Sequence, residues 1–420
     1  MSNNSSKQVP KTKVRWTDKL CRTLLFSRLG KIEVGQVKII DHYGEQVFGA
    51  AEGSSELYVE LKIEDPRFYS DIAFGGTVAA GEAYMQGYWR CNNLTALVRI
   101  MLRNREVMDQ VEEGFSLFKA PILRVLHWLN RNSQVGSRRN IEAHYDLGNE
   151  MFELFLDPTM MYSCAYYPDN ETTLDQAAVA KLQRICDKLQ LSESDHVIEI
   201  GTGWGGFAIY AATHYGCKVT TTTISRQQFE VAQQRVIAAG LEDKVTLLME
   251  DYRDLQGSYD KLVSIEMIEA VGPQYLDTYF AKCSSLLKSD GIMLIQAITI
   301  QDQFYDQAIK SVDFIQRYIF PGGFIPSVTA ISNAVKKSTD VRLFQMEDIG
   351  PHYATTLRDW RKSFFDNLEQ VKALGYSDQF IAMWEFYLCY CEGGFLERTL
   401  GTSHLVFTKP RNSIDWRGSI

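Results

Sequence analysis

A glycine-rich segment, Val197–Gly206 (VIEIGTGWGG), carries the strongest chemical signal in the chain. It joins an apolar stretch typical of a buried strand to a stretch typical of a helix. Glycines at such a turn let the backbone bend sharply and approach a ligand closely. Because a strand precedes the glycines and a helix follows them, the segment predicts a cofactor site. The alternative is a tight turn that binds nothing.

The residues around this turn favour one cofactor over another. A dinucleotide site has an acidic residue ~20 positions further on that binds the ribose hydroxyls, whereas the next strand here ends VTTTTIS (219–225) with no acid. Glu199, just ahead of the glycines, can meet a cationic amine. Asp251 and Tyr252 follow the third strand and can contact an adenine edge. This set fits S-adenosylmethionine better than NAD.

The elements that must position these residues form an alternating pattern. Apolar runs typical of strands alternate with helical segments, which indicates βαβ units and a mostly parallel sheet. The runs lie at 196–200, 218–223, 245–249, 261–265 and 292–297, with two later ones at 341–346 and 405–408. We therefore expect a Rossmann-like α/β domain of seven strands. A helical insertion between the fifth and sixth strands, together with the helices before the last strand, should cap the active site.

The N-terminal third has a different pattern. Residues 1–15 are predicted to be a disordered tail, and 16–114 a small α+β domain that begins with an amphipathic helix at Trp16–Leu29 and continues in alternating strands. Residues 115–140 contain Lys119, four arginines and no acid, together with an apolar stripe that includes Trp128. A basic amphipathic helix of this kind can lie in a membrane interface, or it can pack on its own protein.

Composition narrows the class of protein. The chain has 420 residues, 45% of them hydrophobic, and a net charge of −8, which argues against a general nucleic-acid binder. No run of eighteen apolar residues predicts a spanning helix, and no secretory signal is recognisable. The eight cysteines are scattered without CxxC pairs, so reduced cytoplasmic thiols are expected rather than a zinc or disulfide framework.

Several segments together resemble the cyclopropane fatty-acyl-phospholipid synthases, a family of S-adenosylmethionine-dependent fatty acid C-methyltransferases. They are AHYDLGNEMFELFLDPTMMYSCAYY (143–167), IEIGTGWGG, TTISRQQ (222–228), EDYRDL (250–255), IEMIEAVG (265–272), YIFPGG (318–323), PHYATTLRDW (351–360) and CYCEGGF (389–395). GEAYMQGYW (81–89) is similar to the N-terminal lipid-domain motif of the family. The resemblance covers the chain after about residue 30 and implies a class I methyltransferase domain at 141–410, followed by a tail at 411–420.

The resemblance also implies the site residues. Besides Glu199, it places the cofactor against Tyr162, Ser163, Gly201, Gly203, Thr223, Ile224, Gln228, Asp251 and Tyr252. Gln228 would bind the ribose in place of the missing acid. A bound bicarbonate would serve as the base, held by Cys164, Glu269, Ile298 and Tyr353. Cys164 is expected to contribute through its backbone, not as a thiolate.

One position departs from the family pattern. Where many members have a histidine in the bicarbonate site, this chain has Gln296. Glutamine still donates a hydrogen bond to an anion, but it does not titrate near neutral pH as histidine does. The departure leaves open whether the reaction ends in ring closure.

The resemblance implies methyl transfer to a cis double bond of a phospholipid acyl chain, giving a cyclopropane. The alternative is a methyl- or methylene-branched chain, with a partner reductase to finish the reaction. A non-catalytic lipid-binding protein and a small-molecule N-methyltransferase are further hypotheses. The protein is expected to be cytoplasmic, peripheral on the inner face of the membrane, and a homodimer.

Overall fold

The structure is a computed structural model that describes residues 14–49, 57–106 and 148–413. The chain divides into two compact units, 1–121 with 377–393, and 122–376 with 394–420. The linear division predicted from sequence assigned 377–393 to the methyltransferase domain, whereas here this segment groups with the N-terminal unit. The predicted basic linker, 115–140, lies outside the described residues.

The first unit is a four-stranded sheet with helices. Its sheet has the order β2-β1-β3-β4. Its elements are α1 (Trp16–Leu29), β1 (Gln36–Asp41), β2 (Gly44–Phe48), β3 (Tyr58–Ile63), α2 (Arg67–Met85), β4 (Trp89–Cys91), α3 (Leu94–Arg103) and most of α17 (Asp378–Leu396). The predicted alternation is present, since Val37 and Ile39 of β1 are buried while their neighbours are partly exposed. Helix α17 is tied to this unit because Tyr84 Oη donates to Glu385 Oε2 (2.7 Å).

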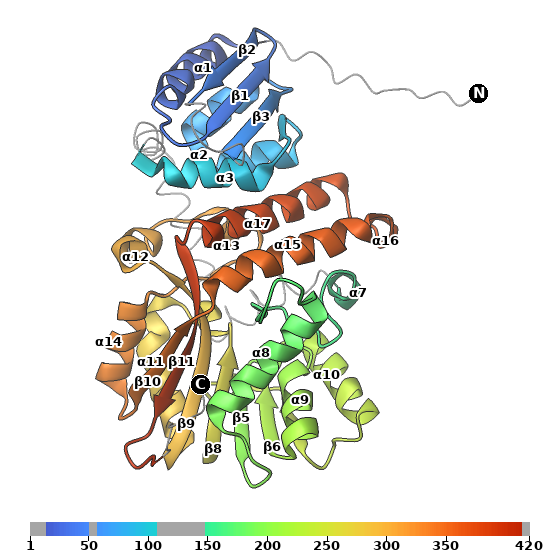
Figure 1. The fold of residues 1–420 in the computed structure, drawn as a ribbon, viewed down its shortest axis with the longest axis vertical. Coiled ribbons are helices and arrows are strands. Elements are labelled where there is room, and N and C mark those ends of the chain that lie inside the picture. The colour runs from blue at the N-terminus through green and yellow to red at the C-terminus, as the bar shows by residue number, and fades with distance from the viewer. Residues whose placement is uncertain (1–13, 50–56, 107–147, 414–420) are drawn as a thin grey trace, which may run out of the picture. The chain divides into compact units, whose positions relative to one another are not determined.

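The second unit is built on a seven-stranded sheet with the order β10-β11-β9-β8-β5-β6-β7 (Figure 1). Its strands are β5 (His196–Ile200), β6 (Lys218–Thr222), β7 (Val245–Leu248), β8 (Tyr259–Ile265), β9 (Leu287–Ile300), β10 (Arg342–Asp348) and β11 (Leu400–Thr408). Strands β5 to β9 are parallel, and β11 inserts antiparallel between β9 and β10. The seven predicted strands are confirmed.

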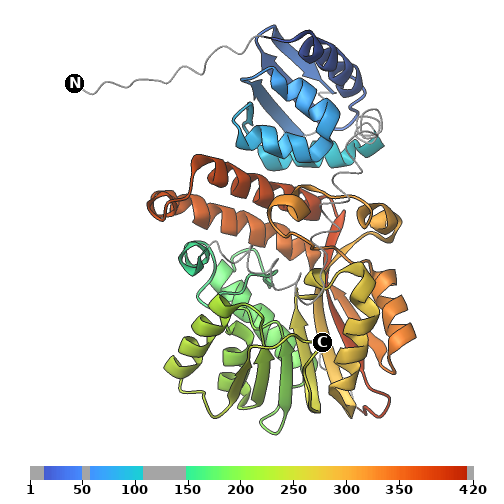
Figure 2. The ribbon, with the colours of Figure 1, turned by 180° about the vertical axis from the view of Figure 1, so that it is seen from behind.

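Helices cover both faces of this sheet (Figures 1 and 2). One face packs against α8 (Leu174–Leu189), α9 (Gly206–Tyr215) and α10 (Arg226–Ala238), and the other against α11 (Leu276–Ser285) and α14 (Val328–Ser338). Successive residues of β9 serve opposite faces, because Leu294 joins the core on the first face and Ile295 the core on the second. The sheet is therefore buried on both sides, as expected for parallel strands.

The remaining helices of this unit are short or lie at the end of the sheet. They are α7 (Asn149–Glu153), η3 (Ile268–Ala270), η4 (Pro273–Tyr275), α12 (Asp302–Ala308), α13 (Phe314–Tyr318), α15 (Gly350–Asp366) and α16 (Leu368–Ala373). Of the helices expected to cap the site, α15 runs beyond the carboxyl ends of the parallel strands (Figure 1). Helix α14 instead packs on a face of the sheet, where Ile331 and Val335 join the core. Among the described residues, no helix is long and apolar enough to cross a bilayer.

Candidate active site

The glycine turn connects β5 to α9 through backbone that only glycine adopts without strain. Gly201, Gly203 and Gly205 have φ values of 102°, 53° and 86°. The amides of Gly201 and Thr202 donate to Thr222 O (3.1 and 2.9 Å), which ties the turn to the end of β6. The turn predicted from sequence is therefore present and anchored between two strands.

The turn leaves open space where a ligand would approach. A Cβ built on Gly203 meets no atom within 4 Å, whereas one on Gly201 would lie 3.2 Å from the Met267 side chain. The open side at Gly203 lies on the carboxyl edge of the sheet, next to the ends of β6 and β7. This geometry fits S-adenosylmethionine. That cofactor, when bound, supplies an electrophilic methyl group.

Two further predicted cofactor segments lie at the ends of β6 and β7. Thr223 Oγ1 donates to Gln228 Oε1 (2.9 Å), which fixes the buried glutamine at the start of α10. Ile224 lies in the same turn. Both carboxylate oxygens of Asp251 accept hydrogen bonds from Arg253 (2.7 and 2.8 Å), while the neighbouring Tyr252 packs against Tyr279 with ring centroids 5.5 Å apart.

Glu199, which the sequence predicts to meet the cofactor amine, is deeply buried. Its side chain is 2% exposed, and its Oε2 accepts a hydrogen bond from Thr221 Oγ1 (2.6 Å). Burial raises the pKa of Glu199 to about 8, although the Thr221 bond and the charge of Lys181 oppose the rise. The Glu199 side chain thus links β5 to β6 through this hydrogen bond. Its contact with the cofactor stays a prediction.

Glu199→Gln is expected to flatten the pH dependence of stability. The folded pKa of about 8 lies above the ordinary value of 4.5. The carboxyl's contribution is therefore fully present below pH 4.5 and lost as pH rises through about 8, by at most roughly 5 kcal/mol. Urea midpoints from pH 5 to 9, without cofactor, should fall less steeply for E199Q than for wild type. The exposed Glu369→Gln is the control, and an unchanged slope in E199Q would contradict the assignment.

The loop before α8 brings Tyr162, Ser163 and Cys164 to the same edge. Arg235 of α10 holds this loop, since it donates to Thr159 O (3.1 Å) and to Trp204 O in the glycine turn (2.8 Å). The buried Lys181 donates to Ser163 Oγ (2.7 Å). The predicted cofactor residues of the loop and of the turn are thereby linked through α8 and α10.

Two glutamates lie at the carboxyl end of β8, and one of them received no role from the sequence. Glu266 accepts three hydrogen bonds. Cys164 N (2.9 Å) and Gln296 Nε2 (2.7 Å) donate to its Oε1, and Tyr353 Oη (2.6 Å) donates to its Oε2. The available signal was its position, three residues before Glu269 in the IEMIEAVG segment.

Glu269 is held differently. Its Oε1 accepts from Ile298 N (2.6 Å), while its Oε2 is buried and has no hydrogen-bond partner among the described residues. Burial, and next the negative charge of Glu266, raise the pKa of Glu269 to about 8. The protonated form of Glu269 is therefore favoured at neutral pH.

Gln296 is oriented by a histidine on the neighbouring strand. His404 of β11 lies opposite Gln296 of β9, and its Nε2 is 3.0 Å from Gln296 Oε1. Burial lowers the pKa of His404 well below its usual range, so the ring is neutral and donates from Nε2. This bond directs the amide nitrogen of Gln296 toward Glu266. Sequence reasoning missed His404, because its partner lies more than a hundred residues away.

Cys164 is fully buried, and burial raises the pKa of its thiol well above the usual range. Its Sγ donates weakly to Ala165 O (3.2 Å), whereas its backbone N–H contacts Glu266. The geometry agrees with a contribution through the backbone and with a neutral thiol.

The predicted bicarbonate site does not fit an added anion. Cys164 N, Gln296 Nε2 and Tyr353 Oη, which would hold it, already donate to Glu266, and Ile298 N donates to Glu269. A bicarbonate would have to displace a carboxylate and lie beside another carboxyl group. Three of the five predicted catalytic residues, Cys164, Gln296 and Tyr353, thus contact Glu266, and the other two, Ile298 and Glu269, contact each other.

A series of aromatic rings begins at Tyr353, whose hydroxyl group donates to Glu266. The Tyr353 ring lies 6.0 Å from that of Trp360, which lies 5.2 Å from that of Tyr162, with Phe320 6.2 Å beyond. Trp360 is fully buried. Aromatic faces in a dry site attract positive charge, so this cluster suits a reaction that develops a cation.

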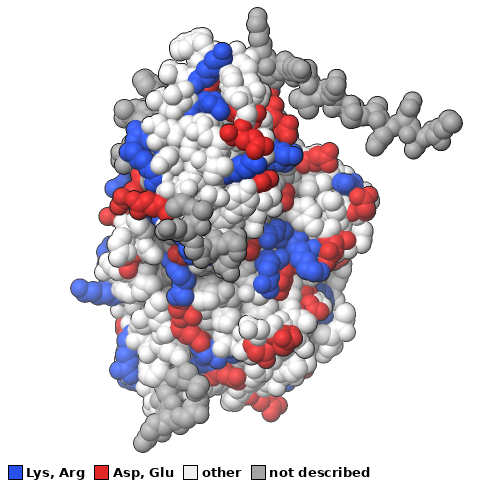
Figure 3. Space-filling model, turned by 45° about the horizontal axis from the view of Figure 1, so that its top comes forward, with Lys and Arg blue, Asp and Glu red and all other residues white. Residues whose placement is uncertain are grey.

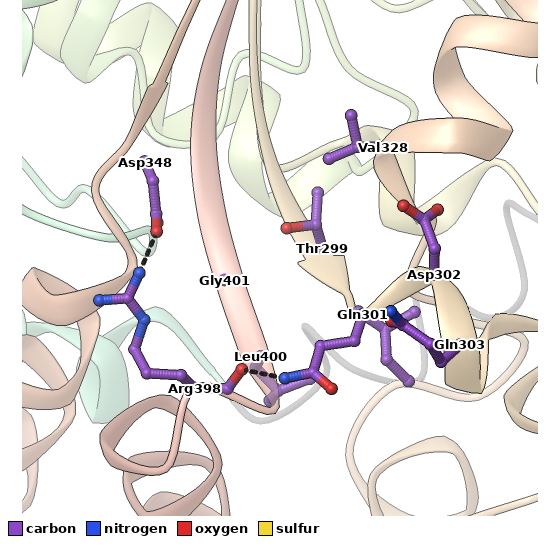
Figure 4. Close-up of a pocket in the computed structure, with 10 residues that line it drawn as sticks. Thr299, Gln301, Asp302, Gln303, Val328, Asp348, Arg398, Leu400 and Gly401 are labelled. Carbon is purple, nitrogen blue, oxygen red and sulfur yellow. Dashed lines mark hydrogen bonds and ion pairs between the residues drawn. The ribbon is translucent and has the colours of Figure 1, made fainter.

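A separate hollow lies at the ends of β9 and β11 (Figure 4). Its wall contains the ion pair of Arg398 with Asp348 and the amide of Gln301, which donates to Arg398 O (2.9 Å). None of the predicted site residues lines it. Its polar lining does not suit an acyl chain, and we assign it no role.

Comparisons with known proteins agree with this geometry. A family model described as mycolic acid cyclopropane synthetase matches residues 132–405. The tuberculostearic acid methyltransferase UfaA1 of Mycobacterium tuberculosis is 38% identical over 76% of this chain and 76% of that protein. The cyclopropane-fatty-acyl-phospholipid synthase of Escherichia coli K12 is 38% identical over 83% and 88%. The solved structure of the mycolic acid cyclopropane synthase CmaA1 with SAH and CTAB is 29% identical, with a TM-score of 0.59, over 65% of this chain and 98% of that chain.

The seven-stranded sheet and its glycine turn define a class I S-adenosylmethionine-dependent methyltransferase with a small N-terminal α+β domain. Within that class, the chain belongs to the mycolic acid cyclopropane synthetase family. The predicted fold class, family and cofactor S-adenosylmethionine are confirmed. The hypothesis of a non-catalytic lipid-binding protein is set aside.

Proposed function

We propose that the protein transfers the methyl group of S-adenosylmethionine to a cis double bond of a phospholipid acyl chain and closes a cyclopropane ring. The carrying observation is the pair Glu266 and Glu269, joined through Tyr353 to the aromatic cluster that contains Tyr162. An alkene attacks the methyl carbon weakly and leaves a cation on the neighbouring carbon. The ring faces stabilise that cation, and the carboxylate accepts the proton whose loss closes the ring.

Ring closure and chain branching begin with the same methyl transfer. They differ in which carbon loses the proton, and therefore in where the base lies relative to the cation. The branched product is the second candidate, because Gln296 replaces a titratable histidine and because one relative is named a tuberculostearic acid methyltransferase. A partner reductase belongs to that candidate only. Bicarbonate is left out of both, since its donors are engaged.

A product assay separates these candidates. The purified protein is incubated with S-adenosylmethionine and vesicles of cis-unsaturated phospholipid, and the released fatty acids are identified by gas chromatography with mass spectrometry. Cyclopropane and methylene products share a mass, so NMR or mild hydrogenation must distinguish them. A cyclopropane supports the main proposal, and a methyl or methylene branch replaces it with the second. Turnover of a soluble amine in place of lipid would overturn both.

The setting is proposed to be the inner face of the cytoplasmic membrane, with the protein bound peripherally as a homodimer. In Figure 3, Lys and Arg side chains form several clusters with acidic side chains between them on the face that is drawn. The basic segment 115–140 is the proposed source of membrane attraction, because it contains five basic residues and no acid. Its structure lies outside the described residues.

Neutralising this segment should weaken binding to anionic vesicles. Each basic residue near a membrane surface contributes about 1 kcal/mol, so removing four charges should lower affinity by roughly 100-fold or more at low salt, and less at high salt. The variant replaces Arg124, Arg131, Arg138 and Arg139 with glutamine, and the control replaces the exposed Arg226, Lys337, Arg358 and Lys362. Vesicle co-sedimentation measures both. Equal binding of variant and wild type would mean that the segment packs internally.

A further inference from the structure

The Glu266 carboxylate lies among three hydrogen-bond donors that could otherwise bind a free anion. Its two oxygens receive hydrogen bonds from a loop amide, a strand side chain and a helix hydroxyl, namely those of Cys164, Gln296 and Tyr353. Cys164 and Gln296 are fully buried, and Tyr353 is 6% exposed. Glu266 itself keeps part of its surface accessible. The carboxylate is thus fixed in place by three donors that are themselves buried.

The backbone at Glu266 is strained in a way that points to a function. Its φ is 50°, in the left-handed region where glycine is favoured. A non-glycine residue there costs about 1 kcal/mol or more and persists only where its surroundings over-determine it. The three hydrogen bonds to Glu266 hold the residue in this conformation. The strained backbone therefore serves to position its carboxylate.

We propose that the Glu266 carboxylate is the built-in base of this enzyme and makes it independent of bicarbonate. Its donors are three of the five residues that the family resemblance places around the bound anion, so its carboxylate stands where bicarbonate would stand. This inference rests on the proposed acyl methylation. It deepens that function by naming the proton acceptor.

The hydrogen-bond geometry favours the negative charge on Glu266 over Glu269. Burial raises the pKa of Glu266 above its usual range, although the bonds from Tyr353, Cys164 and Gln296 and the charge of Lys181 oppose the rise. Glu269 has the orphaned Oε2 and no such set of donors among the described residues. When the pair holds one proton, that proton therefore resides on Glu269, because the donors stabilise the negative charge on Glu266.

The step balances without a further reagent. The alkene π pair forms the bond to the transferred methyl carbon, and the carbon–sulfur bond breaks with its pair on sulfur. A Glu266 oxygen then removes one proton from the new methyl group. The electron pair of that C–H bond forms the third side of the ring, and the proton on Glu266 later passes to solvent. In the branched alternative, the same oxygen takes the proton from a chain carbon and the pair forms a double bond.

The test compares Glu266→Gly with Glu266→Gln in the full-length protein. Glycine relieves the strained φ and vacates the anion position, whereas glutamine fills it without accepting a proton. Wild-type turnover should be equal in CO₂-depleted buffer and in buffer with added bicarbonate. Both variants should lose roughly 100-fold or more in depleted buffer. Bicarbonate should restore E266G at least tenfold and leave E266Q unchanged.

A second readout does not depend on turnover. Labelled ¹³C-bicarbonate should show NMR line broadening with E266G and none with wild type or E266Q. Gln190→Gly is the matched control, because Gln190 has the same φ of 50° and lies at the end of α8. Q190G should show wild-type turnover and no bicarbonate binding. Thermal unfolding and cofactor affinity establish that each variant is folded.

The outcomes separate this inference from the proposed function. No product from wild type with any unsaturated phospholipid overturns the proposed function. Product that depends on bicarbonate in wild type, or E266Q that keeps more than a tenth of the rate, overturns the base assignment alone. A folded E266G that binds no bicarbonate contradicts the claim that Glu266 occupies an anion position.

Discussion

Glu269→Ala is expected to lower turnover by roughly 10²–10³-fold while cofactor affinity stays within about threefold of wild type. The substitution removes the acceptor of Ile298 N (2.6 Å) and a carboxyl group whose raised pKa favours its protonated form at neutral pH. It also opens a void beside Glu266 that water can enter, which would relax the position of the base. Product formation under saturating lipid gives the rate, and calorimetric titration gives the affinity for S-adenosylmethionine.

The isosteric variant Glu269→Gln separates the effect of losing the carboxyl group from the effect of opening a void. At neutral pH the protonated form of Glu269 is favoured, because burial and the charge of Glu266 raise its pKa to about 8. Glutamine resembles this neutral form and keeps an oxygen for Ile298 N, so E269Q should retain at least about a tenth of the rate at pH 7. Full activity of E269A would show that the carboxyl group is dispensable. Loss of cofactor binding in both variants would mean that Glu269 shapes the cofactor site instead.

Gly203→Val is expected to weaken S-adenosylmethionine binding by at least roughly 100-fold. The φ of Gly203 is 53°, and a Cβ there meets no protein atom within 4 Å, so a larger side chain enters the space left for the cofactor. The valine therefore collides with the ligand and not with the protein, and the fold should bear only the cost of the strained φ, on the order of 1–2 kcal/mol. Calorimetric titration and methyl-transfer rates at low cofactor concentration measure the effect.

Gly240→Val is the matched control for this substitution. Gly240 has a φ of 66° and also has no atom within 4 Å of a built Cβ, but it follows α10, at the amino-terminal side of β7. It should carry the same backbone strain and leave cofactor affinity unchanged. If both valine variants bind the cofactor as wild type does, the open side at Gly203 is not the cofactor site.

The sequence by itself determined the scaffold of the methyltransferase unit. Period and spacing identified the strands, because a buried parallel strand must be apolar over its length and the run at 292–297 lies within β9. The glycine turn was also readable, since φ values such as 102° at Gly201 restrict the residue type at that position. Local constraints of this kind act within a few residues and leave a pattern in the chain.

Only the tertiary structure decided what the chemical groups contact. Glu266 receives its donors from a loop about a hundred residues earlier, from β9 and from α15, and Gln296 is oriented by His404 on β11. Strand order and helix placement create these contacts, and no spacing in the sequence encodes them. The bicarbonate site was implied by the family resemblance, which names the donors and not what they contact. The fold shows that those donors serve a side chain of the protein, because β8 turns through a strained left-handed residue and directs that carboxylate into their midst.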